Sequence, residues 1–270
     1  MSNIVGYGNC NTELIIKLLN YSGYNADYIN NYKKIKSNTY FSQNELSLLE
    51  NADILIIQPT PNSNGQLSSK HVITTLIKPT CKIFFIVFYR NNMDKTIDIN
   101  IDIDMIKRCD NLGLKLVEEF NNFTCYVPHM ETFFKNNYQK YRLFHSAGHP
   151  SYYFINEIIT QLSEKFSLSI TNDINVFYKR CKFMGTQTII SKKIRDSKQY
   201  DFINSSQYCL IHKYEKNYYA IDELLLNKLL ESLNVNKLNG NFMELMVKSS
   251  INYTYEQTNI PILLKISDIH

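Results

Sequence analysis

Tryptophan is absent from this chain, and proline, cysteine and glycine are scarce, with 6 Pro, 6 Cys and 8 Gly among 270 residues. The cysteines include no C-x-x-C pair, so neither a zinc site nor a disulfide framework is indicated. No apolar run approaches the roughly 20 residues of a membrane span, and the N-terminus lacks the regions of a signal peptide. These absences predict a protein without a membrane span in a cytosol-like compartment, which is the host cytoplasm if the chain is viral.

Charge is also sparse and nearly balanced. Lys and Arg number 29 and Asp and Glu 25, a formal net charge of +4. So small and dispersed an excess argues against nucleic acid as a partner and suits a small polyanionic ligand. The length allows one large domain or two small ones.

Short apolar runs alternate with helical patterns in the first half of the chain. Continuously apolar strands separated by helices are typical of a parallel sheet covered on both faces. The predicted fold class is therefore α/β, with a doubly wound, mostly parallel sheet. The predicted strands are residues 3–7, 53–58, 82–89 and, with a weaker pattern, 114–120, and the predicted helices follow the first strand and cover 71–77 and 103–113.

The pattern changes after about residue 130, where the strongest signals are helical. Helices are predicted over 151–166, 220–235 and 241–251. We expect region 1–130 to form the sheet core with an active-site turn, and the mainly helical region 131–270 to pack on the sheet edge and complete the site. Ligands in such folds bind at the carboxyl edge of the sheet.

The first strand ends in a Gly-Asn-Cys turn, residues 8–10, that leads into a helix. The first helical turn leaves backbone N–H groups that can hold an anion, and Asn11 or Thr12 is the expected N-cap. The G-x-G of residues 6–8, with Asp27 about 20 residues later in a possible strand, partly matches a dinucleotide fingerprint. Its third glycine is missing, so the match is weak evidence for NAD.

Cys10 and Gln58 are the polar groups of interest at the predicted carboxyl edge. The N–H groups of a helix N-terminus favour the thiolate form of a cysteine, so Cys10 has a reason to be reactive. The alternative is a small residue that fills a tight bend. Gln58 ends an apolar strand, and its amide can both donate and accept, either to a ligand or to cap a loop.

Two histidines, His145 and His149, precede a predicted helix start at Pro150 and Ser151. Histidine suits proton transfer near neutral pH, although a structural role is the alternative. The H-x-x-x-H spacing also suggests a metal, but Gly148 and Pro150 argue against a regular helix that presents both rings on one face. We therefore predict no metal site.

Three stretches, in their order and context, resemble the WcbI family of capsular polysaccharide biosynthesis proteins: GNC (8–10), ADILIIQP (52–59) and FHSAGHPS (144–151). The resemblance covers residues 3–165. The family's usual pattern has Gln after the Cys and Asn before the His-Pro, where this chain has Asn11 and Gly148. A further family segment, rich in Phe, Pro and Tyr, appears here only as FFIVFYRNN (84–92).

Members of that family are similar in architecture to SGNH-type hydrolases, bind coenzyme A and are thought to acetylate sugars. The resemblance implies a site bordered by Gly8, Asn9, Cys10 and Gln58 and faced by His145 and His149. The chemistry agrees, because an acetyl thioester needs donors for the oxyanion at its carbonyl. The candidates are the backbone N–H groups of Cys10 and Asn11 and the side chains of Asn9 and Gln58.

The acceptor must lose a proton as it attacks, and His149 is the preferred base with His145 as second choice. Cys10 either carries the acetyl group covalently or is a turn residue in a direct transfer, which suffices for an amine acceptor. The predicted function is an acetyl-CoA-dependent acetyltransferase acting on a sugar, with the amino group of a nucleotide-linked sugar as the expected acceptor.

Two other classes stay open. One is an SGNH-type acyl esterase or deacetylase with a Cys10 or serine nucleophile, although no Gly-Asp-Ser stands at the first turn and no Asp-x-x-His precedes the last helix. The other is a non-catalytic nucleotide-binding module that uses the G-x-G turn alone. It predicts stabilisation by NAD or a nucleotide sugar and not by coenzyme A.

Overall fold

The structure is a computed structural model, which describes residues 2–87, 103–141, 143–146, 149–170, 199, 208–214, 217–222 and 263–265. The chain divides into two compact units. The first takes in the described residues of Met1–Tyr89, Asp102–Phe134 and Phe154–Cys181, and the second those of Arg90–Ile101, Lys135–Tyr153 and Lys182–His270.

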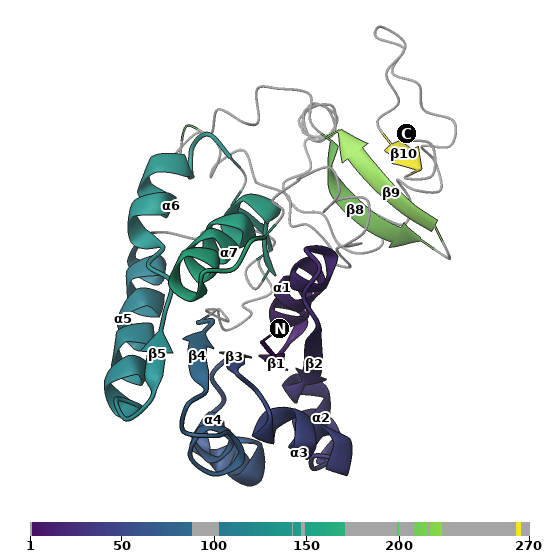
Figure 1. Cartoon of the computed structure of the whole chain (residues 1–270). Coiled ribbons are helices and arrows are strands. Elements are labelled where there is room, and N and C mark those ends of the chain that lie inside the picture. The colour runs from purple at the N-terminus through teal and green to yellow at the C-terminus, as the bar shows by residue number, and fades with distance from the viewer. Residues whose placement is uncertain are drawn as a thin grey trace, which may run out of the picture. The chain divides into compact units, whose positions relative to one another are not determined.

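A five-stranded sheet with the order β2-β1-β3-β4-β5 forms the centre of the first unit (Figure 1). Each neighbouring pair is parallel. The strands are β1 Ile4–Gly8, β2 Ala26–Asn30, β3 Ile54–Ile57, β4 Lys82–Phe85 and β5 Thr124–Tyr126. The predicted doubly wound parallel α/β fold is therefore confirmed.

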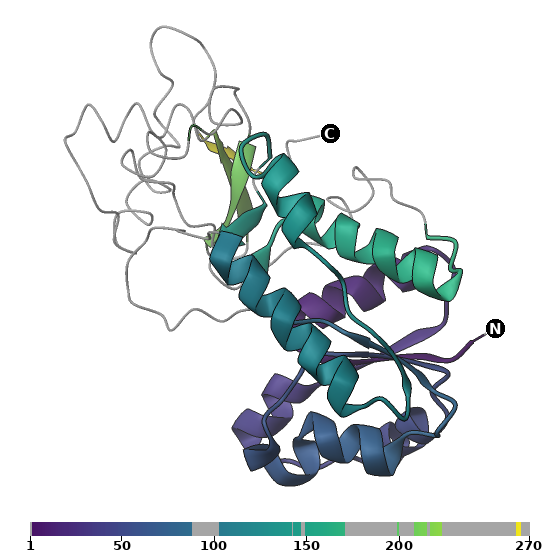
Figure 2. The same ribbon diagram turned by 90° about the vertical axis from the view of Figure 1, so that its left-hand side faces the viewer.

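Helices cover both faces of this sheet. In the sheet, β2 lies on one side of β1, and β3, β4 and β5 lie on the other. Because crossovers between parallel strands are right-handed, helices that connect strands in these two directions lie on opposite faces of the sheet. Figure 2 shows α1 and α7 on one face and α2, α3 and α4 on the other. The helices are α1 Cys10–Tyr21, α2 Asn31–Ser37, α3 Gln43–Glu50, α4 Ser69–His71, α5 Ile103–Glu119, α6 Glu131–Asn137 and α7 Tyr152–Phe166, with 3₁₀ turns η1 Asn62–Leu67 and a π-helical turn η2 Val72–Leu76. Within the described ranges, none of the helices is both long and apolar enough to cross a membrane.

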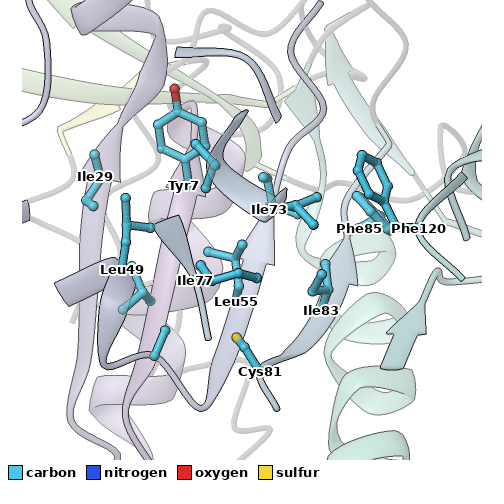
Figure 3. Close-up of a cluster of buried hydrophobic side chains, with 14 residues drawn as sticks. Tyr7, Ile29, Leu49, Leu55, Ile73, Ile77, Cys81, Ile83, Phe85 and Phe120 are labelled. Atoms are coloured by element: carbon cyan, nitrogen blue, oxygen red, sulfur yellow. The ribbon is translucent and has the colours of Figure 1, made fainter. Parts of the chain in front are cut away.

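The face of the sheet opposite α1 carries a continuous apolar core (Figure 3). Alternate strand residues point to it, because successive side chains of a strand face opposite sides. They pack against residues from α3, η2 and the end of α5. Its members include Tyr7, Ile29, Leu49, Leu55, Ile73, Ile83, Phe85 and Phe120.

The strand expected at 114–120 is wrong, because α5 continues through this segment to Glu119. Leu116, Val117 and Phe120 pack on the core, and their spacing is that of one helix face, while Leu114 is 42% exposed. The fifth strand is instead β5, a short segment at the sheet edge.

The second unit contains antiparallel strands in its described part. β6 Phe144–Ser146 pairs with β7 His149–Pro150, and β8 Tyr208–Tyr214, β9 Asn217–Asp222 and β10 Leu263–Lys265 form a sheet with the order β10-β9-β8. The helix predicted over 220–235 is wrong at its start, because residues 220–222 pair with β8 and belong to β9. Its remainder and the helix predicted over 241–251 lie outside the described residues.

Helix α1 packs directly on the backbone of β1 because Gly6 and Gly8 have no side chains. A methyl group at Gly6 would lie 2.5 Å from Cγ1 and 2.9 Å from Cδ1 of Ile16. A methyl group at Gly8 would overlap Oγ1 of Thr12 and lie 2.6 Å from its Cβ. The two glycines therefore set the distance between helix and strand.

This contact predicts strong coupling between Gly6 and Ile16. Gly6→Ala should lower the free energy of unfolding by about 1–3 kcal/mol, because the added methyl overpacks the interface. In an Ile16→Ala background the same change should cost little or stabilise, since the methyl then fills space that Ile16 has vacated. Urea unfolding of the wild type, both single variants and the double variant measures the coupling. Equal costs in the two backgrounds would contradict the direct contact.

Candidate functional site

The carboxyl ends of β1 and β3 lie side by side, and the chain leaves them toward opposite faces of the sheet. This is the topological switch point of a sheet with this order, where ligands bind in doubly wound folds. The backbone N–H of Gln58 donates to the carbonyl of Tyr7 at 2.9 Å, which carries the pairing one residue beyond β3. Gln58 therefore lies next to Gly8 and the turn that follows it.

The peptide group between Gly8 and Asn9 is held from both neighbouring strands. On one side, the Tyr28 hydroxyl, from β2, donates to the carbonyl oxygen of Gly8 at 3.1 Å. On the other side, the N–H of Asn9 donates to Oε1 of Gln58 at 3.0 Å. This turn is thus fixed by side chains where the strand ends.

Asn9 is the N-cap of α1, and the predicted cap at Asn11 or Thr12 is wrong. Oδ1 of Asn9 accepts a hydrogen bond from the N–H of Asn11 at 2.9 Å, and its carbonyl accepts from the N–H of Glu13 at 3.0 Å. The helix begins at Cys10 because the extended backbone of Asn9 ends the strand and lets its side chain fold back onto the first turn.

The orientations of two side-chain amides follow from these bonds. A backbone N–H must meet an oxygen, so Oδ1 of Asn9 and Oε1 of Gln58 face the turn and their NH₂ groups point elsewhere. In the part of the chain that the structure describes, neither NH₂ group meets an acceptor, so both are available as hydrogen-bond donors at the switch point.

Cys10 is the first residue of α1, and its side chain is exposed. The other cysteines with described side chains are less exposed, with Cys109 and Cys125 half-buried. Cys81 is buried, and burial raises the pKa of its thiol to about 12. Burial likewise raises the pKa of Cys125 to about 11. Of these thiols, that of Cys10 is therefore the one most open to a ligand or reagent.

Asn11 and Thr12 lie beneath the turn. Both side chains are buried, with exposed fractions of 1% and 0%. The N–H of Asn11, expected as an oxyanion donor, is engaged by the Asn9 cap, so binding an anion there would require that bond to be exchanged. The Thr12 hydroxyl packs against Gly8, and no hydrogen-bond partner is found for it among the described residues.

The partial dinucleotide fingerprint has a packing explanation. Because Gly6 and Gly8 have no side chains, α1 can pack directly on the strand. Helix packing therefore explains both glycines without a bound ligand. Asp27 pairs with Val5 in the first half of β2, whereas Asn30 is the residue at the carboxyl end of that strand. The acidic residue is therefore not at the edge where a ribose would lie.

The segment after β3 is held by an internal hydrogen-bond network. The buried Tyr7 hydroxyl donates to the carbonyl of Leu67 at 2.7 Å, and the Thr60 hydroxyl donates to the same oxygen at 3.0 Å. Ser69 Oγ accepts from the N–H of Thr60 at 2.7 Å. This border of the switch point is therefore tied to the core strand β1.

His145 and His149 lie in the β6–β7 pair of the second unit, in which Ser146 is opposite His149. The N–H of Ser151 donates to the carbonyl of Leu143 at 2.8 Å, and α7 starts directly after it, as predicted. The structure thus brings together the turn residues and Gln58 within the first unit, whereas the two histidines belong to the second. Across the described segments, no group of three His, Cys, Asp or Glu residues could hold a metal ion.

The fold places the first unit in the class of doubly wound α/β proteins, whose ligands bind at the carboxyl edge of the sheet. No known protein family matches the chain, and no curated protein matches it either. A solved structure of WcbI is similar over 96% of this chain and 97% of that chain, with a TM-score of 0.51 and 12% sequence identity. It is described as a polysaccharide biosynthesis enzyme, in its native form without a disulfide bond between coenzyme A and a cysteine. At this identity the similarity shows the fold alone.

The sequence patterns missed Tyr28 and the capping role of Asn9. Tyr28 is opposite Gly6 in the β1–β2 pairing, on the face of the sheet that α1 covers. An aromatic residue paired with a glycine in the neighbouring strand could have pointed to Tyr28. This signal can be used only when the pairing of the two strands is known.

The N-cap at Asn9 should contribute directly to the stability of the protein. Asn9→Ala should lower the free energy of unfolding by about 0.5–2 kcal/mol, because the Asn11 N–H loses its acceptor. Asn9→Asp keeps the acceptor and adds a negative charge at the helix N-terminus, so it should unfold at or above the wild-type urea concentration. An alanine variant as stable as the wild type would show that the cap contributes nothing.

Proposed function

We propose that this protein is an acetyl-CoA-dependent acetyltransferase that acts on a sugar in glycan or polysaccharide biosynthesis. The observation that carries the proposal is the switch-point turn, where the exposed Cys10, the N-terminus of α1 and the amide donors of Asn9 and Gln58 meet in one place. The similarity in fold to a polysaccharide biosynthesis enzyme whose description involves coenzyme A supports the same reading.

The residues at the turn suit a thioester carbonyl. Acetyl-CoA would supply the acetyl group as a thioester, and acyl transfer places negative charge on the carbonyl oxygen. The NH₂ groups of Asn9 and Gln58 are oriented in advance by the backbone N–H groups that their oxygens accept from. Donors fixed before the reaction stabilise developing charge without reorganisation.

A base must take the proton that the attacking sugar amine or hydroxyl loses. In this proposal His149 is the base and His145 the second choice, since imidazole is the side chain whose ordinary pKa lies closest to neutral pH. Cys10 then borders the thioester in a direct transfer. We propose the amino group of a nucleotide-linked amino sugar as the acceptor, because a neutral amine needs no covalent intermediate.

The ligand is tested by thermal unfolding with coenzyme A, acetyl-CoA, NAD or free nucleotides. Coenzyme A at about 100 times its Kd should stabilise the fold by about 2.7 kcal/mol and raise Tm by roughly 5–10 °C. His149→Ala should keep this rise and lose about 10²–10⁴-fold of acetyl transfer to amino sugars. The exposed His129 provides the control, and His129→Ala should keep both.

Other outcomes identify other functions. Stabilisation by NAD or nucleotides alone would favour a binding module. Release of acetate from acetylated sugars without coenzyme A would favour an esterase. No response to any of these ligands would remove the transferase proposal.

Cys10 should also react with oxidised coenzyme A. Its exposed thiol can attack the disulfide, which forms a Cys10–coenzyme A disulfide and releases one coenzyme A thiol. Mass spectrometry should find this adduct mainly on the Cys10 peptide, because Cys81 is buried, Cys109 and Cys125 are half-buried, and burial raises the pKa of the Cys81 and Cys125 thiols. Cys10→Ser should lose the adduct and, because direct transfer needs no covalent carrier, keep measurable acetyl transfer. An acetylated Cys10 in the absence of acceptor would instead support the covalent route.

A further inference from the structure

Tyr28 reaches the switch point from β2, a strand that carries none of the proposed catalytic or ligand-binding residues. It lies on β2, two positions before the strand's last residue, and its Cα is paired with that of Gly6. Ile16 of α1 fills the space that a side chain at Gly6 would occupy, so Tyr28 lies on the face of the sheet that α1 covers. The ring is partly buried, and its hydroxyl donates to the carbonyl of Gly8 at 3.1 Å.

The two ends of one peptide group are held by two different strands. In a trans peptide the C=O and the following N–H lie in one plane and point in opposite directions. Tyr28 binds the C=O of Gly8, and Gln58 binds the N–H of Asn9, so the plane of this peptide cannot rotate without breaking one of the bonds.

The phenol is suited to be a permanent donor in this bond. Burial, and then the charges of Glu13 and Cys10, raise the pKa of Tyr28 well above its usual value. The hydroxyl therefore stays protonated through the physiological range and keeps donating to Gly8. A phenylalanine would fill the same space and lose only the hydrogen bond, so the hydroxyl can be tested apart from the ring.

We propose that Tyr28 is a positioning residue, which fixes the Gly8–Asn9 peptide and through it the first turn of α1 and the direction of the Cys10 side chain. Gln58 holds the other end of the same peptide, so its amide is both a candidate ligand donor and a support for the turn. We call these two hydrogen bonds, Tyr28 to the Gly8 carbonyl and the Asn9 N–H to Gln58, the clamp. The consequence for acetyl transfer rests on the proposed function. The consequence for the turn does not.

The experiment compares Tyr28→Phe with Tyr40→Phe, a matched control because Tyr40 is 62% exposed. Amide hydrogen exchange in residues 8–13 should become about fivefold faster in Tyr28→Phe, the effect of losing one ordinary hydrogen bond. Peptides from β3 and β4 should exchange as in the wild type, and Tyr40→Phe should change neither. Acetyl transfer by Tyr28→Phe should show kcat lowered about tenfold with KM within about twofold, because misplacement affects the transition state more than ligand binding.

The outcomes separate the two proposals. Faster exchange confined to residues 8–13 supports the clamp even if the wild type shows no acetyl transfer, in which case only the proposed function fails. Unchanged exchange in residues 8–13 overturns the clamp, whatever the activity. Equally faster exchange in β3 and β4 also overturns it, because Tyr28 would then be a general packing residue.

Discussion

The close approach of α1 to β1 is the constraint on which the rest of the site depends. Gly6 and Gly8 let the helix lie on the strand backbone, where any side chain would overlap Ile16 or Thr12. The helix can then begin immediately after the strand, with Asn9 as its only linking residue. As a result, the N–H groups of its first turn lie at the carboxyl edge of the sheet, where doubly wound folds bind ligands.

Hydrogen bonds from the neighbouring strands fix the geometry of the turn between β1 and α1. Tyr28 and Gln58 come from the strands on either side of β1 and hold one peptide between them. Their side chains continue the cross-strand bonding where the backbone ladder stops. The result is a turn whose polar groups are oriented before a ligand arrives, which lowers the reorganisation that binding or catalysis would otherwise require. The proposed acetyl transfer needs this property at the thioester carbonyl.

The similarity to WcbI at 12% identity shows that one fold is reached with few shared residues. Strand burial and helix amphipathicity are enough to specify the sheet, because they depend on residue class and not on particular side chains. Individual hydrogen bonds are not specified in that way. The roles of Asn9, Tyr28 and Gln58 therefore have to be argued from the contacts of this chain.

The sequence by itself determined the parallel sheet, the strand–turn–helix at Cys10 and the position of Gln58 at a strand end, because these follow from apolar runs and turn residues close together in the chain. Only the tertiary structure decided that residues 114–119 continue a helix, since one face of α5 is buried on the core. It also decided that Asn9 is the cap and that Tyr28 meets Gly8. These depend on which strands are neighbours, and contacts between residues far apart in sequence leave no periodic pattern to read.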